Sequence, residues 1–360
     1  MAGRPAQPRL APAPRARRAT PAGLGRFLAR RLGIGALLVV GITLVAFILT
    51  HLVPGDPAAA NLGQTALGDP AIVKAFNHEY GLDKPVPEQY LIYLWKLLHG
   101  NLGISEQSHR AVATDLSQYF PATVELALFA IVVSTILGVG LGVLAAVRRG
   151  HPVDGGLRVL SLLGVSMPTF WVALFVFYLF FYRLGWLPSG GRLNPGVNPP
   201  HTVTGLYTVD ALLSGQWSLF VDALEHLIMP GMVLGLFTIG TMLRFTRASV
   251  LEVINNDYVR AARAKGLSEW TVIRRHVMRP ALLSIATVAG LAFGNLLSGT
   301  VLVENIFGWP GIGQYAYLSA INLDLPAIMG VSVLVAIVYI VINLLVDLAY
   351  SILDPRIELR

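Results

Sequence analysis

The sequence of 360 residues contains no cysteine, so disulfide bonds, thiolate metal ligands and cysteine nucleophiles are excluded. Lysine is nearly absent as well. Only four of the 27 basic residues are lysines, and none of the four follows a glycine. Because the phosphate-binding loop of P-loop ATPases requires a Gly-Lys pair, the sequence excludes ATP binding in that manner.

Charged residues are scarce too, at 13% against 54% hydrophobic residues. A soluble domain normally carries about a quarter charged residues. The composition therefore predicts an all-α membrane protein that crosses the bilayer several times. The net charge of +7 is concentrated in a few loops, so orientation in the membrane explains it better than nucleic-acid binding does.

Patterns typical of an enzyme are missing. The eight histidines are scattered, no His-Glu-x-x-His motif occurs, and no pair of acidic residues has a site-like spacing within an apolar run. An enzyme is therefore the least supported class of protein, and we expect no catalytic residue and no bound metal or cofactor.

Six apolar runs predict six transmembrane helices, since about 20 apolar residues span a bilayer. They cover approximately residues 32–53, 121–147, 159–182, 227–243, 281–303 and 325–346. Residues 1–31 precede them with eight arginines, five prolines and no acid, which predicts a disordered basic tail. Two roles stay open for this tail: setting the topology passively or lying on anionic lipid. Residues 32–360 then form the transmembrane domain.

The distribution of basic residues orients the predicted spans. With both termini in the cytoplasm, cytoplasmic segments hold 21 lysines and arginines, whereas the external segments hold six. Positive residues accumulate on the cytoplasmic side, so this topology is favoured. It places residues 54–120 outside and residues 244–280 inside. Within the external loop, Pro87–His99 predicts an amphipathic helix at the membrane boundary.

Polar or helix-breaking residues inside the runs are candidates for a transport path. Glu125 lies one turn inside the second span, where it either guides a substrate or simply reaches water. The third span is interrupted, and the fifth carries small and polar side chains, which fit either a solvated path or tight packing. The candidate path residues are Ser166, Met167, Pro168, Asn295 and Ser298.

The most informative segment lies between the fourth and fifth spans. Asn255–Asp257 can cap a helix of alanines and arginines, Gly266 can end it in the left-handed conformation, and Ser268 can cap a second helix. Pro280 suits the first turn of the following apolar helix. The alternative is an ordinary basic cytoplasmic loop, which most membrane proteins have.

This segment resembles the EAA loop of importer-type ATP-binding-cassette (ABC) permeases, through Ala261-Ala262-x-x-x-Gly266. The longer run Tyr258-Val259-Arg260-x-Ala262-Arg263-Ala264-Lys265-Gly266-Leu267 is similar to the dipeptide, oligopeptide and nickel permease subfamily. The eponymous glutamate is replaced by Arg260. Other stretches that resemble the subfamily are YGLDKPVPEQYLIYLWKLLHGNLGIS, LGWLPSGGR, ENIFGWPGIGQYAYLSAINLDLP and Leu353-Asp354-Pro355-Arg356.

The resemblance implies a type I ABC importer permease fold with a cytoplasmic coupling helix between spans four and five. It implies a multi-pass protein of the bacterial plasma membrane, working with a second homologous permease subunit, two ATPase subunits that carry ATP and magnesium, and an extracytoplasmic substrate-binding protein. The implied ATPase-coupling residues are Tyr258, Arg260, Ala261, Ala262, Lys265, Gly266, Leu267, Ser268, Trp270 and Ile273.

Two questions stay open at this stage. Similarity favours di- or oligopeptides as cargo, but nickel complexes, glutathione and haem are carried by similar permeases. The second class of protein to consider is a secondary transporter driven by an ion gradient. Such transporters usually hold ionisable residues at midplane depth, and the centres of the predicted spans contain none.

Overall fold

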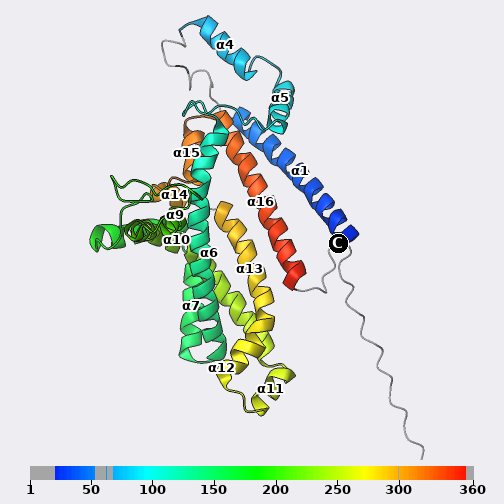
Figure 1. Cartoon of the computed structure of the whole chain (residues 1–360), viewed down its shortest axis with the longest axis vertical. Coiled ribbons are helices and arrows are strands. Elements are labelled where there is room, and N and C mark those ends of the chain that lie inside the picture. The colour runs from blue at the N-terminus through cyan, green and yellow to red at the C-terminus, as the bar shows by residue number, and fades with distance from the viewer. Residues whose placement is uncertain (1–20, 53–61, 63–67, 299, 354–360) are drawn as a thin grey trace, which may run out of the picture.

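Every regular element in the part of the chain that the structure describes is a helix (Figure 1). The structure is a computed structural model that describes residues 21–52, 62, 68–298 and 300–353. Four of these helices are long and apolar enough to cross a membrane, and two bent helix pairs raise the number to six if each pair is one span. The four are α1 (Pro21–Leu52), α6 (Val112–Val147), α10 (Trp217–Ile254) and α16 (Leu325–Leu353).

Several helices extend beyond the predicted spans. Helix α1 begins at Pro21, so the part of the predicted tail that the structure describes is helical. Helix α6 begins at Val112 and contains Pro121 in its interior. Val112 and Leu116 are buried against Tyr315 and Val331. This packing stabilises the helical turns before Pro121, which the sequence analysis placed in the external loop.

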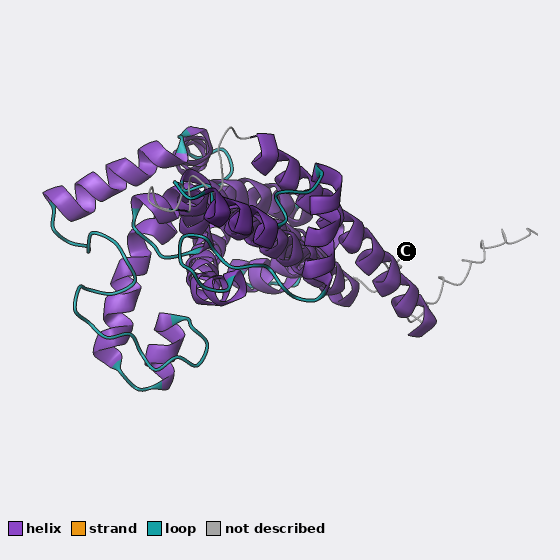
Figure 2. Ribbon diagram, turned by 90° about the horizontal axis from the view of Figure 1, so that it is seen from above, coloured by secondary structure: helices purple, strands orange, loops and turns teal. Residues whose placement is uncertain are grey.

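Helices α6 and α10 form the centre of the molecule and lie in close contact along much of their length. Glycines allow the close approach: a methyl group built on Gly142 would lie 2.6 Å from Cβ of Thr246 and 2.9 Å from the carbonyl oxygen of Leu243. Gly138 meets Met242 in the same way, one turn earlier. Around this pair, α13 (Met278–Ser298) and the other helices complete the bundle seen end-on in Figure 2.

Gly142→Ala is expected to lower the free energy of unfolding by about 1–3 kcal/mol, because the added methyl group overpacks the α6–α10 contact. Gly140→Ala is the matched control, since nothing lies within 4 Å of its position. That change should be neutral or stabilise the helix by up to ~1 kcal/mol. Thermal unfolding of both variants in detergent checks the difference, and equal shifts would contradict the packing argument.

The predicted third span consists of two helices that meet at 103°. Helix α7 (Pro152–Ser166) is followed by its C-cap residue Met167, and α8 (Thr169–Val176) continues into the π-helix η1 (Phe177–Arg183). Met167 has extended backbone angles, as expected for a residue that precedes a proline, because the ring of Pro168 clashes with a helical conformation before it. The interruption predicted at residues 166–168 is therefore a sharp break between two helices.

The predicted fifth span is also bent, by 52°. It starts with the short helix α12 (Glu269–Thr271), continues through the π-helix η2 (Val272–Val277) and ends with α13. Pro280 lies in the first turn of α13. Because proline has no N–H group, Pro280 cannot donate to the carbonyl of His276 four residues earlier, and the hydroxyl of Tyr258 lies 3.5 Å from that oxygen.

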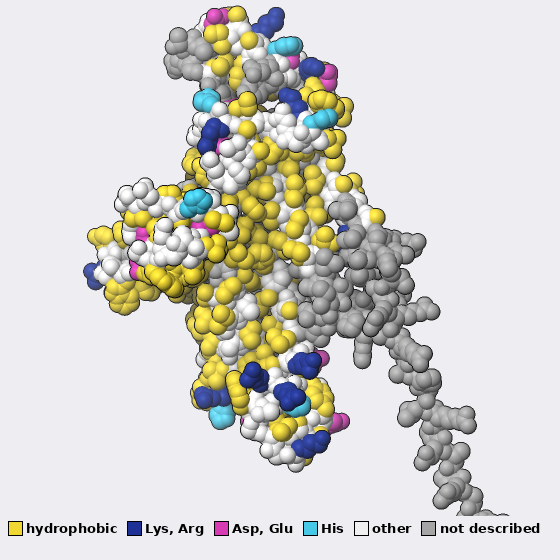
Figure 3. Space-filling view, viewed as in Figure 1, with side chains coloured by type: hydrophobic (Ala, Val, Ile, Leu, Met, Phe, Trp, Pro, Cys, Tyr) yellow, Lys and Arg dark blue, Asp and Glu magenta, His cyan; other side chains and the backbone are white. Residues whose placement is uncertain are grey.

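The two ends of the bundle differ in composition. At one end lie α4 (Pro70–Tyr80) and α5 (Val86–Leu98), and at the other lie α11 (Asp257–Ala264) and α12 (Figure 1). Tyr90 of α5 donates to the carbonyl of Val40 and packs on Phe47, so α5 lies against the outer part of α1. Figure 3 shows a band of hydrophobic side chains between the two charged ends, as expected for a protein in a bilayer.

Candidate functional site

The segment between α10 and α13 folds into a projecting corner at the end of the bundle opposite α4 (Figure 1). Helix α11 follows Asn256, and its inner face is buried: Val259 is 0% exposed and Ala262 is 5% exposed. These residues form one core cluster with Val250 of α10, Val277 of η2, and Ala146 and Ile285 of the spans. Displacing α11 therefore displaces α6, α10 and α13, because a close-packed core transmits strain.

The outer face of α11 is open. Tyr258 and Ala261 are exposed, and Lys265 follows them at the end of the helix. Arg260 pairs with Asp257 on the surface. Of the α11 residues proposed to contact a partner, Tyr258, Arg260 and Ala261 are exposed on this face, whereas Ala262 is buried in the chain's own core.

Gly266 and Ser268 shape the corner between α11 and α12. Gly266 has φ of 76°, the left-handed conformation that a glycine adopts without strain. Ser268 accepts a hydrogen bond from the N–H of Thr271 at 3.4 Å and so caps α12, as its position indicates. Arg263 and Glu269 bridge the corner at 2.8 Å.

Beyond the corner, the candidate coupling residues separate into two groups. Trp270 is 71% exposed and Leu267 is 39% exposed, so both are available to a partner. Ile273 is 8% exposed and belongs to the inner side. We define the coupling surface as the exposed residues of this corner: Tyr258, Arg260, Ala261, Lys265, Gly266, Leu267, Ser268 and Trp270.

A groove of about 470 Å³ runs between α8, α10 and α13. Its polar groups are Thr169, Thr238, Thr241 and Asn295, and its walls are apolar side chains such as Phe237 and Leu291. The hydroxyl of Thr241 is buried without a hydrogen-bond partner in the part of the chain that is described. The groove offers hydroxyl and amide groups in an apolar channel, and none of its lining side chains is charged.

The structure brings only part of the predicted path to this groove. Asn295 lines it. Ser166, Met167 and Pro168 are exposed at the break that precedes Thr169, outside the groove lining. The side chain of Ser298 lies outside the described residues. Thr238 and Thr241 were missed, although threonines within an apolar run are a signal that the sequence contains.

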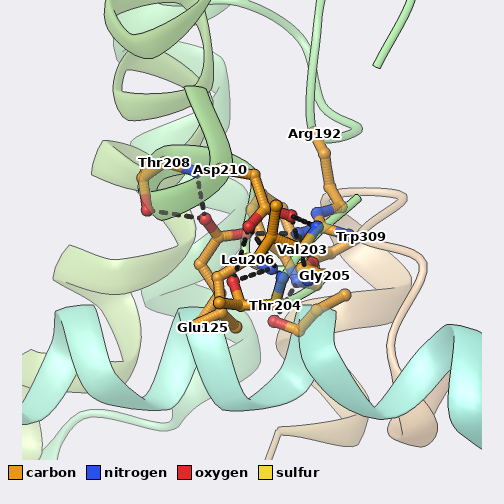
Figure 4. A network of polar contacts seen from close by, with 10 residues as sticks. Glu125, Arg192, Val203, Thr204, Gly205, Leu206, Thr208, Asp210 and Trp309 are labelled. Atoms are coloured by element: carbon orange, nitrogen blue, oxygen red, sulfur yellow. Dashed lines mark hydrogen bonds and ion pairs between the residues drawn. The ribbon is translucent and has the colours of Figure 1, made fainter. Parts of the chain in front are cut away.

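Glu125 does not face open water but is 4% exposed and lies in a buried polar network (Figure 4). Its carboxylate accepts hydrogen bonds from Arg192 at 2.6 Å and from the N–H and hydroxyl of Thr208 at 2.7 Å. The Arg192 guanidinium stacks over Tyr207 at 3.4 Å and donates to the carbonyl of Gly205. The loop between η1 and α10 is therefore fixed to α6 through a buried ion pair.

Asp210 organises the same loop. Its carboxylate accepts hydrogen bonds from the N–H groups of Val203, Thr204 and Gly205 and from the Thr204 hydroxyl (Figure 4). Burial raises the pKa of Asp210, but these hydrogen bonds outweigh burial and hold the pKa below its ordinary value. Asp210 is therefore a structural anion that shapes the turn before α9 (Tyr207–Leu213).

Glu304 of α14 (Val301–Ile306) makes a second anchor on α6. It is fully buried and accepts hydrogen bonds from the Thr123 hydroxyl at 2.7 Å and from the N–H of Gln314 at 2.9 Å. Burial raises the pKa of this carboxyl group despite these hydrogen bonds. The indole of Trp309 donates to the carbonyl of Ala122, so the segment that follows α13 is held closely on α6.

No group of three or more histidine, aspartate or glutamate side chains is placed to hold a metal ion within the described ranges. The buried carboxylates instead bind the chain's own loops. The described residues thus combine a hydrophobic helical bundle, an uncharged groove and an exposed charged corner. These features define a multi-pass membrane protein of the transport class.

The chain belongs to the family of binding-protein-dependent transport system inner membrane components, whose model matches residues 138–359. The model of the N-terminal part of such components matches residues 24–127. The resemblance seen in the motifs is therefore confirmed, and so is the expectation of an all-α protein of the inner membrane.

Curated relatives agree with the family match. A probable D,D-dipeptide transport system permease protein, DdpB of Escherichia coli K12, is 43% identical over 89% of this chain and 94% of its own length. The dipeptide transport system permease protein DppB of Alkalihalophilus pseudofirmus is 40% identical over 91% of this chain and 98% of its own. An inward-facing structure of the MetNI methionine ABC transporter aligns with a TM-score of 0.45 and 15% identity, covering 65% of this chain and 94% of that one.

Proposed function

We propose that this chain is the permease subunit of an ATP-driven importer and forms half of the translocation path for di- or oligopeptides. The observation that carries the proposal is the exposed corner at α11 and α12, which is built on a core shared with three spans. If transport is driven by ATP, a chain without a P-loop lysine obtains that energy from a partner, and this corner is the part that a partner from the cytoplasm would contact. ATP and magnesium belong to two separate ATPase subunits.

The coupling surface supports transmission by contact. Reversing an equilibrium from 1:99 to 99:1 needs about 5.5 kcal/mol of differential binding. Exposed ion pairs contribute about 0–1 kcal/mol each, so they do not suffice. Burial of exposed apolar groups such as Leu267 and Tyr258 in an ATPase subunit supplies the larger part.

The groove supports the second half of the proposal. It is open along one side, and a second homologous permease subunit would complete it to a closed path. Hydroxyl and amide groups in an apolar wall suit the backbone of a short peptide without selecting one side chain. Peptide cargo is preferred because the relatives DdpB and DppB carry dipeptide names. An extracytoplasmic binding protein would deliver the cargo at the α4–α5 end.

Uptake by the complete complex in proteoliposomes tests the function. We expect labelled dipeptide to accumulate only when ATP and the binding protein are present, with nickel complexes, glutathione and haem as competing cargoes. Accumulation of one of these instead would replace the peptide assignment. Uptake that persists without ATP and follows a proton gradient would assign the chain to the secondary transporters.

A further inference from the structure

An open cavity of about 490 Å³ lies beside the corner and is lined by Trp270, Thr271, Arg274, Arg275, Arg279 and Leu282. We propose that this cavity, here called the arginine pocket, binds the phosphate group of an anionic phospholipid of the cytoplasmic leaflet. The proposal concerns a lipid site and goes beyond the proposed transport function.

The charges of the pocket are uncompensated. Arg274, Arg275 and Arg279 are exposed, and none has an acidic side chain within ion-pair distance among the described residues. Arg247, Arg260 and Arg263, at the same end of the molecule, each pair with a carboxylate. The pocket lining contains no acidic residue. Three guanidinium groups around one cavity therefore present a site for an external anion, and their planar forks match phosphate oxygens.

The position of the pocket favours a lipid over a soluble anion. Leu282 is 49% exposed and lies at the bend of the fifth candidate span, where the apolar helix begins. Trp270 belongs to α12, and Arg274 and Arg275 belong to η2, the elements that precede α13 at this end of the bundle. Figure 3 shows basic side chains gathered at this end, below the hydrophobic band. A phospholipid matches this arrangement, because its phosphate group would lie beside the arginines and its acyl chains beside the apolar helix. Basic pockets at the cytoplasmic ends of spans bind such headgroups.

The pocket is also separate from the groove. The pocket is lined by residues of α12, η2 and the start of α13, whereas the groove is lined by Val288, Leu291 and Asn295 farther along α13. The two share no lining residue, and the span bends by 52° between them. The arginine pocket is therefore not part of the groove lining.

Photo-cross-linking tests the proposal on the full-length chain without ATPase subunits, so the result does not depend on the transport assignment. The chain is placed in phosphatidylcholine nanodiscs that contain photoactivatable phosphatidylglycerol. We expect the photoactivatable phosphatidylglycerol to cross-link to the peptide that spans Trp270–Leu282. The variant Arg274→Gln/Arg275→Gln/Arg279→Gln should reduce this labelling at least about tenfold, because each arginine at the surface contributes to the attraction. Arg279→Lys should reduce the labelling less than the triple variant does, because lysine keeps the positive charge.

The matched control is Arg148→Gln/Arg149→Gln/Arg244→Gln, which removes the same charge from three exposed arginines at the cytoplasmic ends of α6 and α10. It should leave the labelling of the Trp270–Leu282 peptide unchanged. An equal loss in the control, or equal labelling by photoactivatable phosphatidylcholine, would overturn the proposal. Co-purification of the pocket variant with the ATPase subunits is measured separately. A pocket variant that keeps its lipid label but no longer binds the ATPase subunits would also overturn the proposal, since the pocket would then be a protein contact.

Discussion

Arg192→Ala is expected to lower the free energy of unfolding by about 3–5 kcal/mol, because removing one member of a buried ion pair leaves the other charge uncompensated. Arg192 is 7% exposed and Glu125 is 4% exposed, and their charged atoms lie 2.6 Å apart. The change also removes the contact with Tyr207 and the hydrogen bond to Gly205. The loop between η1 and α10 would lose its attachment to α6.

Chemical or thermal unfolding in detergent measures this loss. Arg183→Ala is the control, since Arg183 is exposed near the same loop and makes no ion pair within the described residues. Its effect should stay within about 0.5 kcal/mol. The double variant Glu125→Gln/Arg192→Met should recover part of the stability, because no lone charge remains buried. Equal effects of Arg192→Ala and Arg183→Ala would show that the buried pair does not stabilise the loop.

Ala261→Phe is expected to reduce substrate-stimulated ATPase activity of the assembled complex by at least about tenfold. The new ring on the exposed face of α11 would overpack the contact with an ATPase subunit, at a cost of about 1–3 kcal/mol. The chain itself should stay folded, because Ala261 is outside the core. Co-purification of the ATPase subunits and the stimulated rate are the two measurements.

Two comparisons sharpen this test. Ala75→Phe makes the same change at an exposed alanine of α4, at the opposite end of the bundle, and should leave ATPase binding unchanged. Ala262→Phe is unsuitable as evidence of docking, because Ala262 is 5% exposed and packs in the core with Val250 and Val277. Full activity of the Ala261→Phe complex would contradict docking at α11.

Local chemistry made several elements predictable. The break before Pro168, the left-handed Gly266 and the Ser268 cap each follow from one residue and its neighbours. The amphipathic helix predicted at Pro87–His99 corresponds to α5. Apolar runs predicted where the four long apolar helices lie, since length and hydropathy are read along the chain.

Long-range packing accounts for what was missed. The sequence identified Glu125 as an isolated acidic residue in an apolar run. Its ion pair with Arg192 was not predictable, because Arg192 is 67 residues away in a loop without periodicity. The inner orientation of Ala262 and Ile273 depends on the cluster with α6, α10 and α13, which helical spacing alone does not specify. The start of α6 at Val112 likewise reflects burial against α15 (Ile312–Ile321) and α16.

The central claim is that the coupling surface lies in the cytoplasm under an ATPase subunit, and the lack of cysteine allows a direct measurement. Ala261→Cys places a single thiol on that surface. A membrane-impermeant maleimide should label it in inverted vesicles but not in intact cells, and bound ATPase subunits should block the reaction. Ala75→Cys on α4 should show the opposite sidedness. Labelling of the Ala261→Cys variant in intact cells, or undiminished labelling under bound ATPase subunits, would contradict the account.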